Sequence, residues 1–406
     1  MQIKPILSAL RHHKAGTMLI MLQIALTLAI VCNALFIIQQ RLSRLSSPSG
    51  VVEAQVLRIQ NQWVEDNRAS YGALIAGDLD VLRRVPGVVD AYVTNSLPLS
   101  QSGGSTPINL KPNQRDATAQ SAFYFGDTHA VPTLGLRLVA GRNFLLDEIS
   151  QLRATDQPIP PVVIISKALA DKLFPDTSAL GKQVFIDPSK PTTVIGVVAR
   201  LETPWVGQSW GNTNAMLLPF RWVDQSVNYV LRVRPGEMAN VIKAAPKALF
   251  AANRMRVIPI ENGVQSFSQI RADAYARDRG MAILMGVISI VLLAITAAGI
   301  VGLTSFWVGQ RRKQIGIRRA LGATKHDILS YFLTENLLIA FAGVLVGAVL
   351  AVGLNAWMMH QFEMQRLSPL YLGIGIIVLL LLGQGAVLAP ALRASRVPPV
   401  VATRSV

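Results

Sequence analysis

Four long apolar runs dominate the pattern of hydrophobic and polar positions along the chain. They cover residues 17–38, 281–308, 337–359 and 368–389. An α-helix rises about 1.5 Å per residue, so roughly 20 apolar residues are enough to cross about 30 Å of hydrocarbon. The pattern therefore predicts a membrane protein with four transmembrane α-helices and one large domain between the first and the second.

The region between the first two runs alternates in the manner of strands and amphipathic helices. A strand at 51–59, a helix near 79–84 and a strand at 88–94 recur in the same order at 228–234, 238–251 and 256–260. Two β-α-β units at opposite ends of one domain predict a ferredoxin-like core assembled from both. Residues from about 97 to 222 then form an inserted mixed lobe, with its own strand and helix signals at 162–174 and 194–198. The expected domain is therefore large and of the α+β class.

The net charge of +16 suggests nucleic-acid binding, but the placement of the basic residues argues against it. Six of them lie in the short segment between the second and third runs, namely Arg311, Arg312, Lys313, Arg318, Arg319 and Lys325. Others precede the first run or follow the last. The positive-inside rule accounts for this distribution. Both termini and residues 309–327 are therefore expected in the cytoplasm, and residues 41–275 outside it, with no nucleic-acid partner.

Two arginines run against this rule. Arg41 and Arg44 follow the first run on its predicted outer side. They begin a long translocated region, where charge has little influence on topology.

The first apolar run could instead be a cleavable signal, since Arg11, His12, His13 and Lys14 precede it. It is longer than a usual signal core and lacks a clear A-x-A site, so a retained anchor is expected. Cys32 is a poor lipoprotein site because the residue before it is a bulky valine. As the only cysteine it forms no intrachain disulfide, and it is expected to be a small apolar helix residue.

Two segments superficially match catalytic motifs. The only Gly-Lys pair, Gly181-Lys182, is followed by Gln183, whereas a phosphate-binding loop needs Lys-Ser/Thr after a Gly-rich turn. Residues 207–211 (GQSWG) fit G-x-S-x-G, but that motif works only on a sharp strand-to-helix turn, and a plain loop is expected here. The chain is therefore predicted to be non-catalytic and unable to hydrolyse ATP alone.

The remaining polar residues also point away from metal or proton chemistry. The five histidines, at positions 12, 13, 129, 326 and 360, lie on both sides of the predicted membrane without ligand spacing, so no metal site is expected. Glu335 is the one ionisable group of the predicted spans, placed near a helix N-terminus whose dipole tolerates a carboxylate. Gly343, Gly347 and Ala351 form a small-residue stripe that lets helices approach closely, within one chain or between two.

Five segments give the chain a family resemblance. Residues 314–329 (QIGIRRALGATKHDIL), ahead of a span with Glu335 at its start, are similar to the signature of MacB/FtsX-type ABC transporter permeases. Residues 162–174 (VVIISKALADKLF), followed by 180–184 (LGKQV) and 193–198 (TVIGVV), resemble the MacB-type periplasmic core domain, as do residues 133–144 (TLGLRLVAGRNF). Their order and the layout of one span, a large domain and three spans extend the resemblance over nearly the whole chain.

The resemblance implies a permease subunit of an ATP-driven ABC transporter of the mechanotransmission type. In such transporters, ATP-driven closure of two ATPase subunits passes through a cytoplasmic coupling helix and rearranges the periplasmic domains. The candidate ATPase-coupling residues are Arg311, Arg312, Lys313, Gln314, Ile315, Gly316, Ile317, Arg318, Arg319, Ala320, Leu321, Gly322, Ala323 and Thr324. A basic loop alone also fits an ordinary positive-inside anchor. Apolar residues offering a docking surface, and two glycines allowing close backbone approach, favour the coupling helix.

The resemblance also implies the partners. Members called MacB carry the ATPase at the N-terminus of the same chain, whereas here a short segment precedes the first run, so a separate ABC ATPase that binds ATP and magnesium is expected. No cofactor is expected on this chain itself. A second permease, a periplasmic adaptor and an outer-membrane duct would complete a route for a peptide, antibiotic, toxin or siderophore. Gln314 stands where the family commonly has an acidic residue, which leaves both a homodimer and a heterodimer open.

Two alternative functions remain within the same family. One is a non-transporting signalling permease like FtsX, although such proteins usually have a smaller outer domain. The other is release of lipoproteins from the inner membrane.

The expected domain plan follows from these inferences. It comprises a cytoplasmic N-terminus (1–16), a first span (17–40), a periplasmic domain (41–275), a second span (281–308), a cytoplasmic coupling helix (309–327), a third span (328–359), a fourth span (368–389) and a cytoplasmic tail (390–406). The protein is thus expected to be a multi-pass protein of the bacterial inner membrane.

Overall fold

The computed structural model describes residues 14–64, 68–153, 156, 159–362 and 366–396. The chain forms two units, one reaching up to Ser46 and resuming at Arg277, the other Ser47–Ala276. Arg11, His12, His13 and the end of the predicted tail, 397–406, lie outside the described residues.

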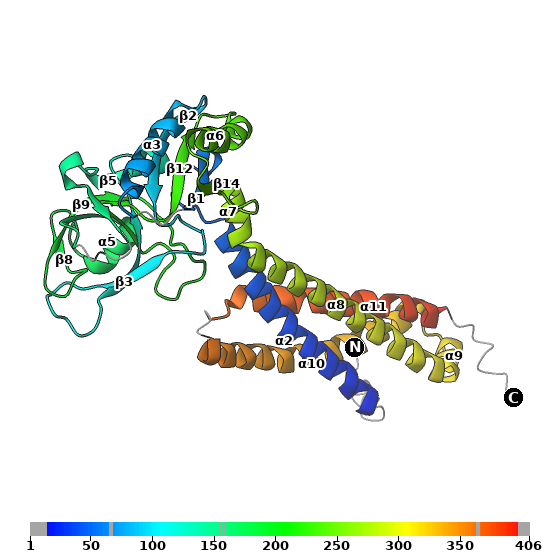
Figure 1. Ribbon diagram of the computed structural model, residues 1–406. Coiled ribbons are helices and arrows are strands. Elements are labelled where there is room, and N and C mark those ends of the chain that lie inside the picture. The colour runs from blue at the N-terminus through cyan, green and yellow to red at the C-terminus, as the bar shows by residue number, and fades with distance from the viewer. Residues whose placement is uncertain (1–13, 65–67, 154–155, 157–158, 363–365, 397–406) are drawn as a thin grey trace. The chain divides into compact units, whose positions relative to one another are not determined.

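The first unit is helical. Its long helices are α2 (Lys14–Leu45), α8 (Ala276–Gln310), α10 (Lys325–Phe362) and α11 (Pro369–Ser395), with the short α9 (Arg312–Ala320) between α8 and α10 (Figure 1). All four long helices are long and apolar enough to cross a membrane. They contain the four apolar runs apart from Ser368, which is the N-cap of α11, and the predicted set of four spans is confirmed.

Helix α2 packs against α10 and α11 and is tied to α8 by polar contacts. Its side chains Ile24 and Leu28 are fully buried. The Asn33 Nδ2 donates to the backbone oxygen of Ala351 in α10 over 3.1 Å, and the hydroxyl oxygens of Thr27 in α2 and Thr296 in α8 lie 2.8 Å apart. In a medium without water these interhelix hydrogen bonds satisfy polar groups that would otherwise be costly to bury.

The small-residue stripe of α10 packs against α2 of the same chain. A Cβ on Gly347 would lie 2.8 Å from the backbone oxygen of Ala25, and one on Gly343 would lie 2.9 Å from that of Met21. The absence of side chains at these positions is therefore what allows the two backbones to touch. Of the two alternatives for this stripe, packing within one chain is the one found in the structure.

An ion pair joins the ends of α2 and α8. Arg41 donates to the carboxylate of Asp278, and both side chains are largely buried. The charge of Arg41, which runs against the positive-inside rule, is thus neutralised by a carboxylate at the start of the next span.

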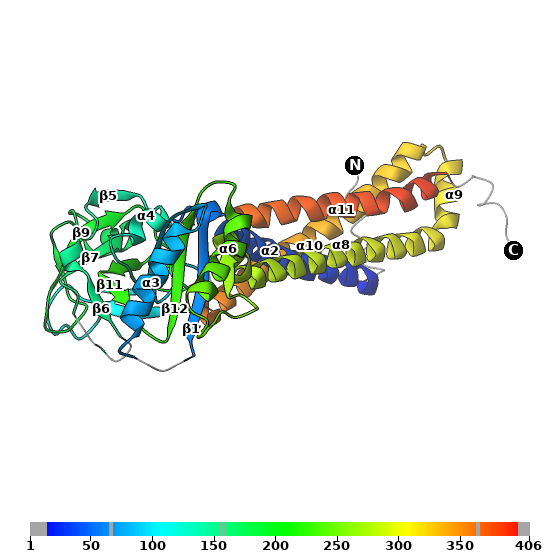
Figure 2. The ribbon, with the colours of Figure 1, turned by 45° about the horizontal axis from the view of Figure 1, so that its top comes forward.

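The second unit contains a ferredoxin-like sheet. Its elements are β1 (Val56–Trp63), α3 (Tyr71–Arg84), β2 (Val88–Thr94), β12 (Ser226–Val233), α6 (Met238–Ala252), β13 (Arg256–Val257) and β14 (Val264–Ser266). The strand order is β13-β1-β12-β2, every neighbouring pair is antiparallel, and β14 also pairs with β1. Each β-α-β unit therefore places its two strands on either side of a strand from the other unit. Helices α3 and α6 lie side by side against this sheet (Figure 2).

Three of the predicted element boundaries differ clearly from the structure. The strand predicted at 256–260 is β13, which ends at Val257. Residues Glu53–Gln55 form a 3₁₀ turn, so the first strand begins at Val56 rather than at residue 51. Helix α3 begins at Tyr71, well before residue 79, because Tyr71, Ile75 and Leu82 place one continuous face in the core. This spacing of apolar residues extends over all of α3, whereas the sequence analysis predicts only the last turns of the helix.

The inserted lobe occupies the predicted place between β2 and β12. It contains β3 (Gly104–Ile108), β4 (Ala119–Phe125), α4 (Ala130–Leu134), β5 (Leu138–Gly141), β6 (Ser150–Leu152), β7 (Val162–Ser166), α5 (Lys167–Leu173), β8 (Gln183–Val184), β9 (Thr192–Val198), β10 (Ala215–Leu218) and β11 (Phe220–Trp222). Its main sheet has the mixed order β3-β4-β10-β7-β9-β5, with β8 on β9, and β6 pairs with β11. The α+β fold with an inserted lobe is confirmed.

A buried ionic network joins the two β-α-β units. The Arg256 guanidinium donates to both carboxylate oxygens of Asp78 over 2.8 Å, and the side chains are 0% and 4% exposed. The Tyr229 hydroxyl donates to the same carboxylate over 2.6 Å, and Arg256 stacks 4.5 Å from the centre of the Trp63 ring. The network holds α3, β12, β13 and β1 in register.

Residues 261–280 contain no proline, so the sequence predicts one helix that continues from them into the second span, but the structure has two helices here. Helix α7 (Phe267–Ala274) ends one residue before α8, and Tyr275 between them leaves helical geometry at φ −98° and ψ 5°. The Tyr275 hydroxyl donates to the buried Glu202 over 3.4 Å. Desolvation raises the pKa of the Glu202 carboxyl, and the ion pair with Arg200 opposes this rise. The expectation of one continuous element is therefore wrong.

Replacing Asp78 with Asn tests the buried network. We expect it to lower the free energy of unfolding by about 3–5 kcal/mol, because the charge of Arg256 would remain buried without its partner. Asp80→Asn is the matched control, since Asp80 lies two residues away on the same helix with a side chain 69% exposed. Chemical denaturation of the purified chain, followed by near-ultraviolet circular dichroism, measures the free energy of unfolding of both variants. Equal losses in the two variants would contradict a stabilising role for the buried network.

Replacing Gly347 with Val tests the close packing of α10 on α2. We expect a loss of about 1–3 kcal/mol, because the added side chain would have to displace the α2 backbone. Gly353→Val on the same helix is the control, since a Cβ there meets nothing within 4 Å. Thermal unfolding in mild detergent should separate the two variants, and a melting temperature lowered equally by both would refute the packing role.

Candidate functional site

The candidate site is the short helix α9, which lies at the end of α8 where α10 begins. Its C-terminus stops at a left-handed glycine, Gly322, with φ 98°. The Gly322 N–H donates to the Arg319 oxygen over 3.2 Å and the Ala323 N–H to the Arg318 oxygen over 3.0 Å, which is the Schellman pattern. A Cβ on Gly322 would meet nothing within 4 Å, so this glycine serves backbone conformation and not the close approach expected of it.

The next helix starts within two residues of that stop. The Thr324 hydroxyl accepts from the Asp327 N–H over 3.1 Å, and the Asp327 carboxylate accepts from the Thr324 N–H over 2.8 Å. This reciprocal pair caps α10 in the manner of a capping box. Consequently α9 and α10 are joined by a turn that leaves little freedom between them.

A buried ion pair anchors the N-terminal end of α9. The Arg311 guanidinium lies 3.1 and 3.0 Å from the two carboxylate oxygens of Glu335 in α10, and the side chains are 12% and 4% exposed. Glu335 lies in the third turn of α10, too far from its N-terminus for the helix dipole to stabilise the carboxylate. The interpretation of Glu335 as a dipole-stabilised group is therefore wrong, and Arg311 is its partner.

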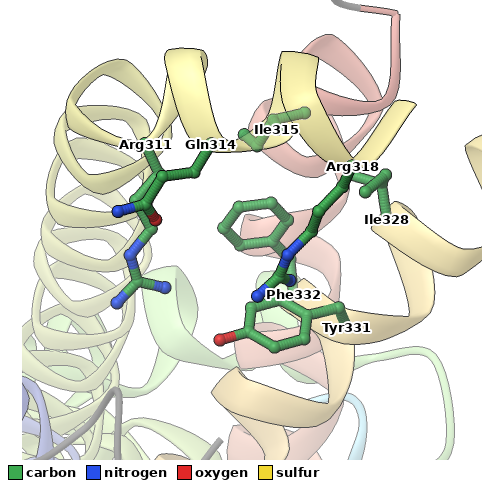
Figure 3. Close-up of a pocket in the computed structure, with 7 residues that line it drawn as sticks. All are labelled: Arg311, Gln314, Ile315, Arg318, Ile328, Tyr331 and Phe332. Carbon is green, nitrogen blue, oxygen red and sulfur yellow. The ribbon is translucent and has the colours of Figure 1, made fainter. Parts of the chain in front are cut away.

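The inner face of α9 packs on α10. Ile315 is buried with Ile328 and Phe332, and the Arg318 guanidinium stacks 5.2 Å from the centre of the Tyr331 ring. These residues, together with Arg311 and Gln314, line a small pocket of about 90 Å³ between the two helices (Figure 3). Helix α9 is thus held on α10 by apolar, ionic and cation–π contacts together.

The outer face of α9 is basic and apolar. The exposed residues of α9 and of the turn after it are Arg312, Lys313, Gln314, Ile317, Arg318, Ala320, Leu321, Gly322 and Thr324. Of these, Gln314 and Arg318 also line the pocket on the inner side. Arg319, Ala323 and Arg311 are half-buried, and Ile315 and Gly316 are buried. Ile317 is 45% and Leu321 83% exposed. Of the predicted residues, therefore, Arg311, Ile315 and Gly316 face the chain itself, and the exposed set is what remains for a partner.

Sequence reasoning missed the residues that hold α9 in place. Tyr331 and Phe332 carried no signal beyond apolar spacing. Thr324 and Asp327 carried a usable one, because T-x-x-D ahead of an apolar run is a cap signature. Glu335 was noticed as an isolated acid, but its partner lies across a turn that the sequence does not reveal.

The segments that superficially match catalytic motifs lie in unsuitable geometry. Gly181 belongs to a turn that leads into the two-residue strand β8, and residues 207–211 form an irregular loop between β9 and β10. Neither sits on a strand-to-helix turn. Among the described residues no cluster of three or more metal-ligating side chains occurs.

Comparison with known families assigns both units. Residues 17–249 match the MacB-like periplasmic core domain, and residues 286–399 match the FtsX-like permease C-terminal domain. The chain belongs to the MacB/FtsX-like family of ABC transporter permeases. It is an inner-membrane protein with a MacB-like periplasmic core domain between its first two spans.

Several relatives carry the name macrolide export ATP-binding/permease protein MacB. That of Neisseria gonorrhoeae is 30% identical over 273 residues, covering 66% of this chain and 39% of its own length. That of Chromobacterium violaceum is 26% identical over 276 residues, covering 66% and 40%. That of Nitrosomonas europaea is 24% identical and covers 97% of this chain and 57% of its own length. The chain spans roughly two-fifths to three-fifths of the length of these relatives.

One solved structure is similar to the periplasmic core domain at low identity. The periplasmic region of MacB from Actinobacillus actinomycetemcomitans is 14% identical, with 57% of this chain and 97% of that one covered and a TM-score of 0.34.

Replacing Arg311 with Gln tests the anchoring of α9. We expect faster amide hydrogen exchange over residues 312–324, because the Glu335 carboxylate would be left buried without a cation and α9 would separate from α10 more often. Arg312→Gln, one residue further on and exposed, is the control. Hydrogen exchange with mass spectrometry on the detergent-solubilised chain measures both, and unchanged protection in Arg311→Gln would refute the anchor.

Proposed function

We propose that this chain is the permease subunit of an ATP-driven transporter that works by mechanotransmission. It exports a peptide, antibiotic, toxin or siderophore from the periplasm. The supporting observation is the construction of α9, which is capped at its C-terminal end, anchored at its start by Arg311 and Glu335, and basic and apolar on its outer face. A helix held in this way transfers displacement to α8 and α10 instead of absorbing it.

The proposed partner on α9 is a separate ABC ATPase with bound ATP and magnesium. Ile317 and Leu321 offer apolar surface for a groove, and Arg312 and Lys313 offer charge for an acidic rim. The positive-inside rule favours a cytoplasmic position for this end of the helical unit, and so for both termini.

The polar groups of the spans favour force transmission over a polar substrate path. Asn33 and Thr27 are engaged in hydrogen bonds between helices, and Glu335 is paired with Arg311. Their side chains therefore hold helices together. Substrates would be handled by the periplasmic domain, and an adaptor and outer-membrane duct would dock on its inserted lobe. A second permease, identical or paralogous, would complete the transporter.

Reversing the charge of Arg312 and Lys313 to Glu tests this proposal. We expect about tenfold or greater loss of the co-purifying ATPase and of its ATP hydrolysis, because like charges would face the acidic rim. Membrane insertion should persist, since neither side chain packs inside the chain. The measurement is affinity purification in mild detergent with quantitative mass spectrometry of partners.

The control reverses Lys243 and Lys247, two exposed residues on α6 of the periplasmic core domain, which changes the net charge equally. It should retain the ATPase. If the α9 variant keeps the ATPase and its activity, or if no ATPase accompanies the unaltered chain, the proposed coupling function is wrong.

A further inference from the structure

A second hollow lies at the opposite end of the helical unit from α9. It has a volume of about 480 Å³ and lies between the C-terminal end of α2 and the N-terminal end of α11. Its lining residues are Phe36, Gln39, Gln40, Ser43, Arg44, Arg366, Ser368 and Tyr371. The hollow is much larger than the pocket beside α9 and is lined mostly by polar side chains.

The hollow lies at the depth of lipid headgroups. The lining residues of α2 begin inside its apolar run at Phe36 and end at Arg44, about 9 Å beyond residue 38 along the helix axis. Helical side chains tilt toward the helix N-terminus, so the Arg44 side chain reaches back toward the apolar layer. The headgroup region on each side of the hydrocarbon is about 5–8 Å thick. Ser368 and Tyr371 stand at the very start of α11, where that helix enters the apolar layer.

The lining has two chemically different parts. Phe36 and Tyr371 form an aromatic contact, with ring centres 5.8 Å apart, toward the apolar side. The other lining residues carry amide, hydroxyl and guanidinium groups, which are hydrogen-bond donors. Leu370 and Ile374, in the same two turns of α11, are 65% and 42% exposed and continue the apolar surface into the membrane. The site is thus polar on its outer side and apolar on the side toward the membrane, and an amphiphile has the same two parts.

The charge of the hollow is entirely positive. Arg44 and Arg366 are the charged side chains among the described residues that line it, and none of these described residues is a carboxylate. Arg41, only one turn earlier on α2, differs because it is paired with Asp278. Two guanidinium groups facing one space repel each other, and a phosphate placed between them relieves that repulsion while accepting paired N–H bonds from each fork. Both arginines run against the positive-inside rule at the ends of spans, so topology does not account for them.

We propose that this hollow binds the phosphate headgroup of an amphiphile whose acyl chains lie along α2 and α11. Arg44 and Arg366 contact the phosphate oxygens, the glutamines and serines donate to the remaining oxygens, and Phe36 with Tyr371 supports the first carbons of the chains. The site requires only that the helical unit lies in a membrane. It is independent of the ATPase coupling proposed for α9, so each proposal can fail without the other.

The test is native mass spectrometry of the full chain in mild detergent with added palmitoyl-oleoyl phosphatidylglycerol. We expect the lipid to be retained by the unaltered chain and its binding to weaken about tenfold or more in R44Q/R366Q, because both charge-assisted contacts are lost. The matched control is R277Q/R279Q, which removes two exposed arginines at the start of α8 and should bind normally. A neutral galactosyl diacylglycerol should bind no better to the unaltered chain than to R44Q/R366Q.

Two further measurements separate the possible outcomes. Glycerol 3-phosphate in excess should not displace the lipid, and displacement would mean a soluble anion site and overturn the amphiphile. If R44Q/R366Q does not fold, R44K/R366K keeps the charge but not the planar fork, and it should bind the lipid more weakly than the unaltered chain. Equal retention of phosphatidylglycerol by the unaltered chain and the folded double variant would overturn the site itself.

Discussion

The buried ion pair of Arg311 and Glu335 is the contact on which the geometry of the α9 end of the helical unit depends. It joins the residue before α9 to the third turn of α10, and both side chains are almost inaccessible. Removing one partner of such a pair typically costs about 3–5 kcal/mol, because the other charge stays buried. Together with the glycine stop at Gly322 and the Thr324 cap, the pair leaves α9 a single placement on α10. A surface that is always presented in one orientation binds a partner with little loss of entropy.

The same device occurs at the other end of α8. Asp278 in its first turn pairs with Arg41 of α2, while Arg311 directly after its last residue pairs with Glu335. Between these points α8 exposes large apolar side chains, such as Ile290 at 69%, and the Thr27 contact with Thr296 is one of its few polar ties to α2. A long helix that is tied at its ends and loosely held in its middle can move as a rigid rod. That property fits a protein proposed to transmit force.

The periplasmic core domain accommodates a large insertion because of its strand order. The last residue of β2, Thr94, pairs with Asn228 in β12, so the chain leaves and re-enters the ferredoxin-like sheet at neighbouring points. The entropic cost of closing a loop between two adjacent points rises only slowly with the length of the loop. The buried ion pair of Asp78 in α3 and Arg256 in β13 joins the two β-α-β units across the insertion. The domain can therefore carry a lobe of its own topology without losing its register.

The sequence by itself determined the four spans, the α+β class, the place of the insertion and the basic segment between the second and third spans, because hydrophobic periodicity and charge bias are local properties. The capping pair of Thr324 and Asp327 can also be predicted from the sequence, because T-x-x-D ahead of an apolar run is a cap signature. Only the tertiary structure decided that Glu335 is paired with Arg311, that Ile315 faces inward while Ile317 faces outward, and that the Gly347 stripe packs within the chain. It also decided that the helix breaks at Tyr275, which hydrogen-bonds Glu202. Each of these contacts joins residues that are distant in the sequence. A contact between two such residues produces no periodic pattern that a single sequence could show.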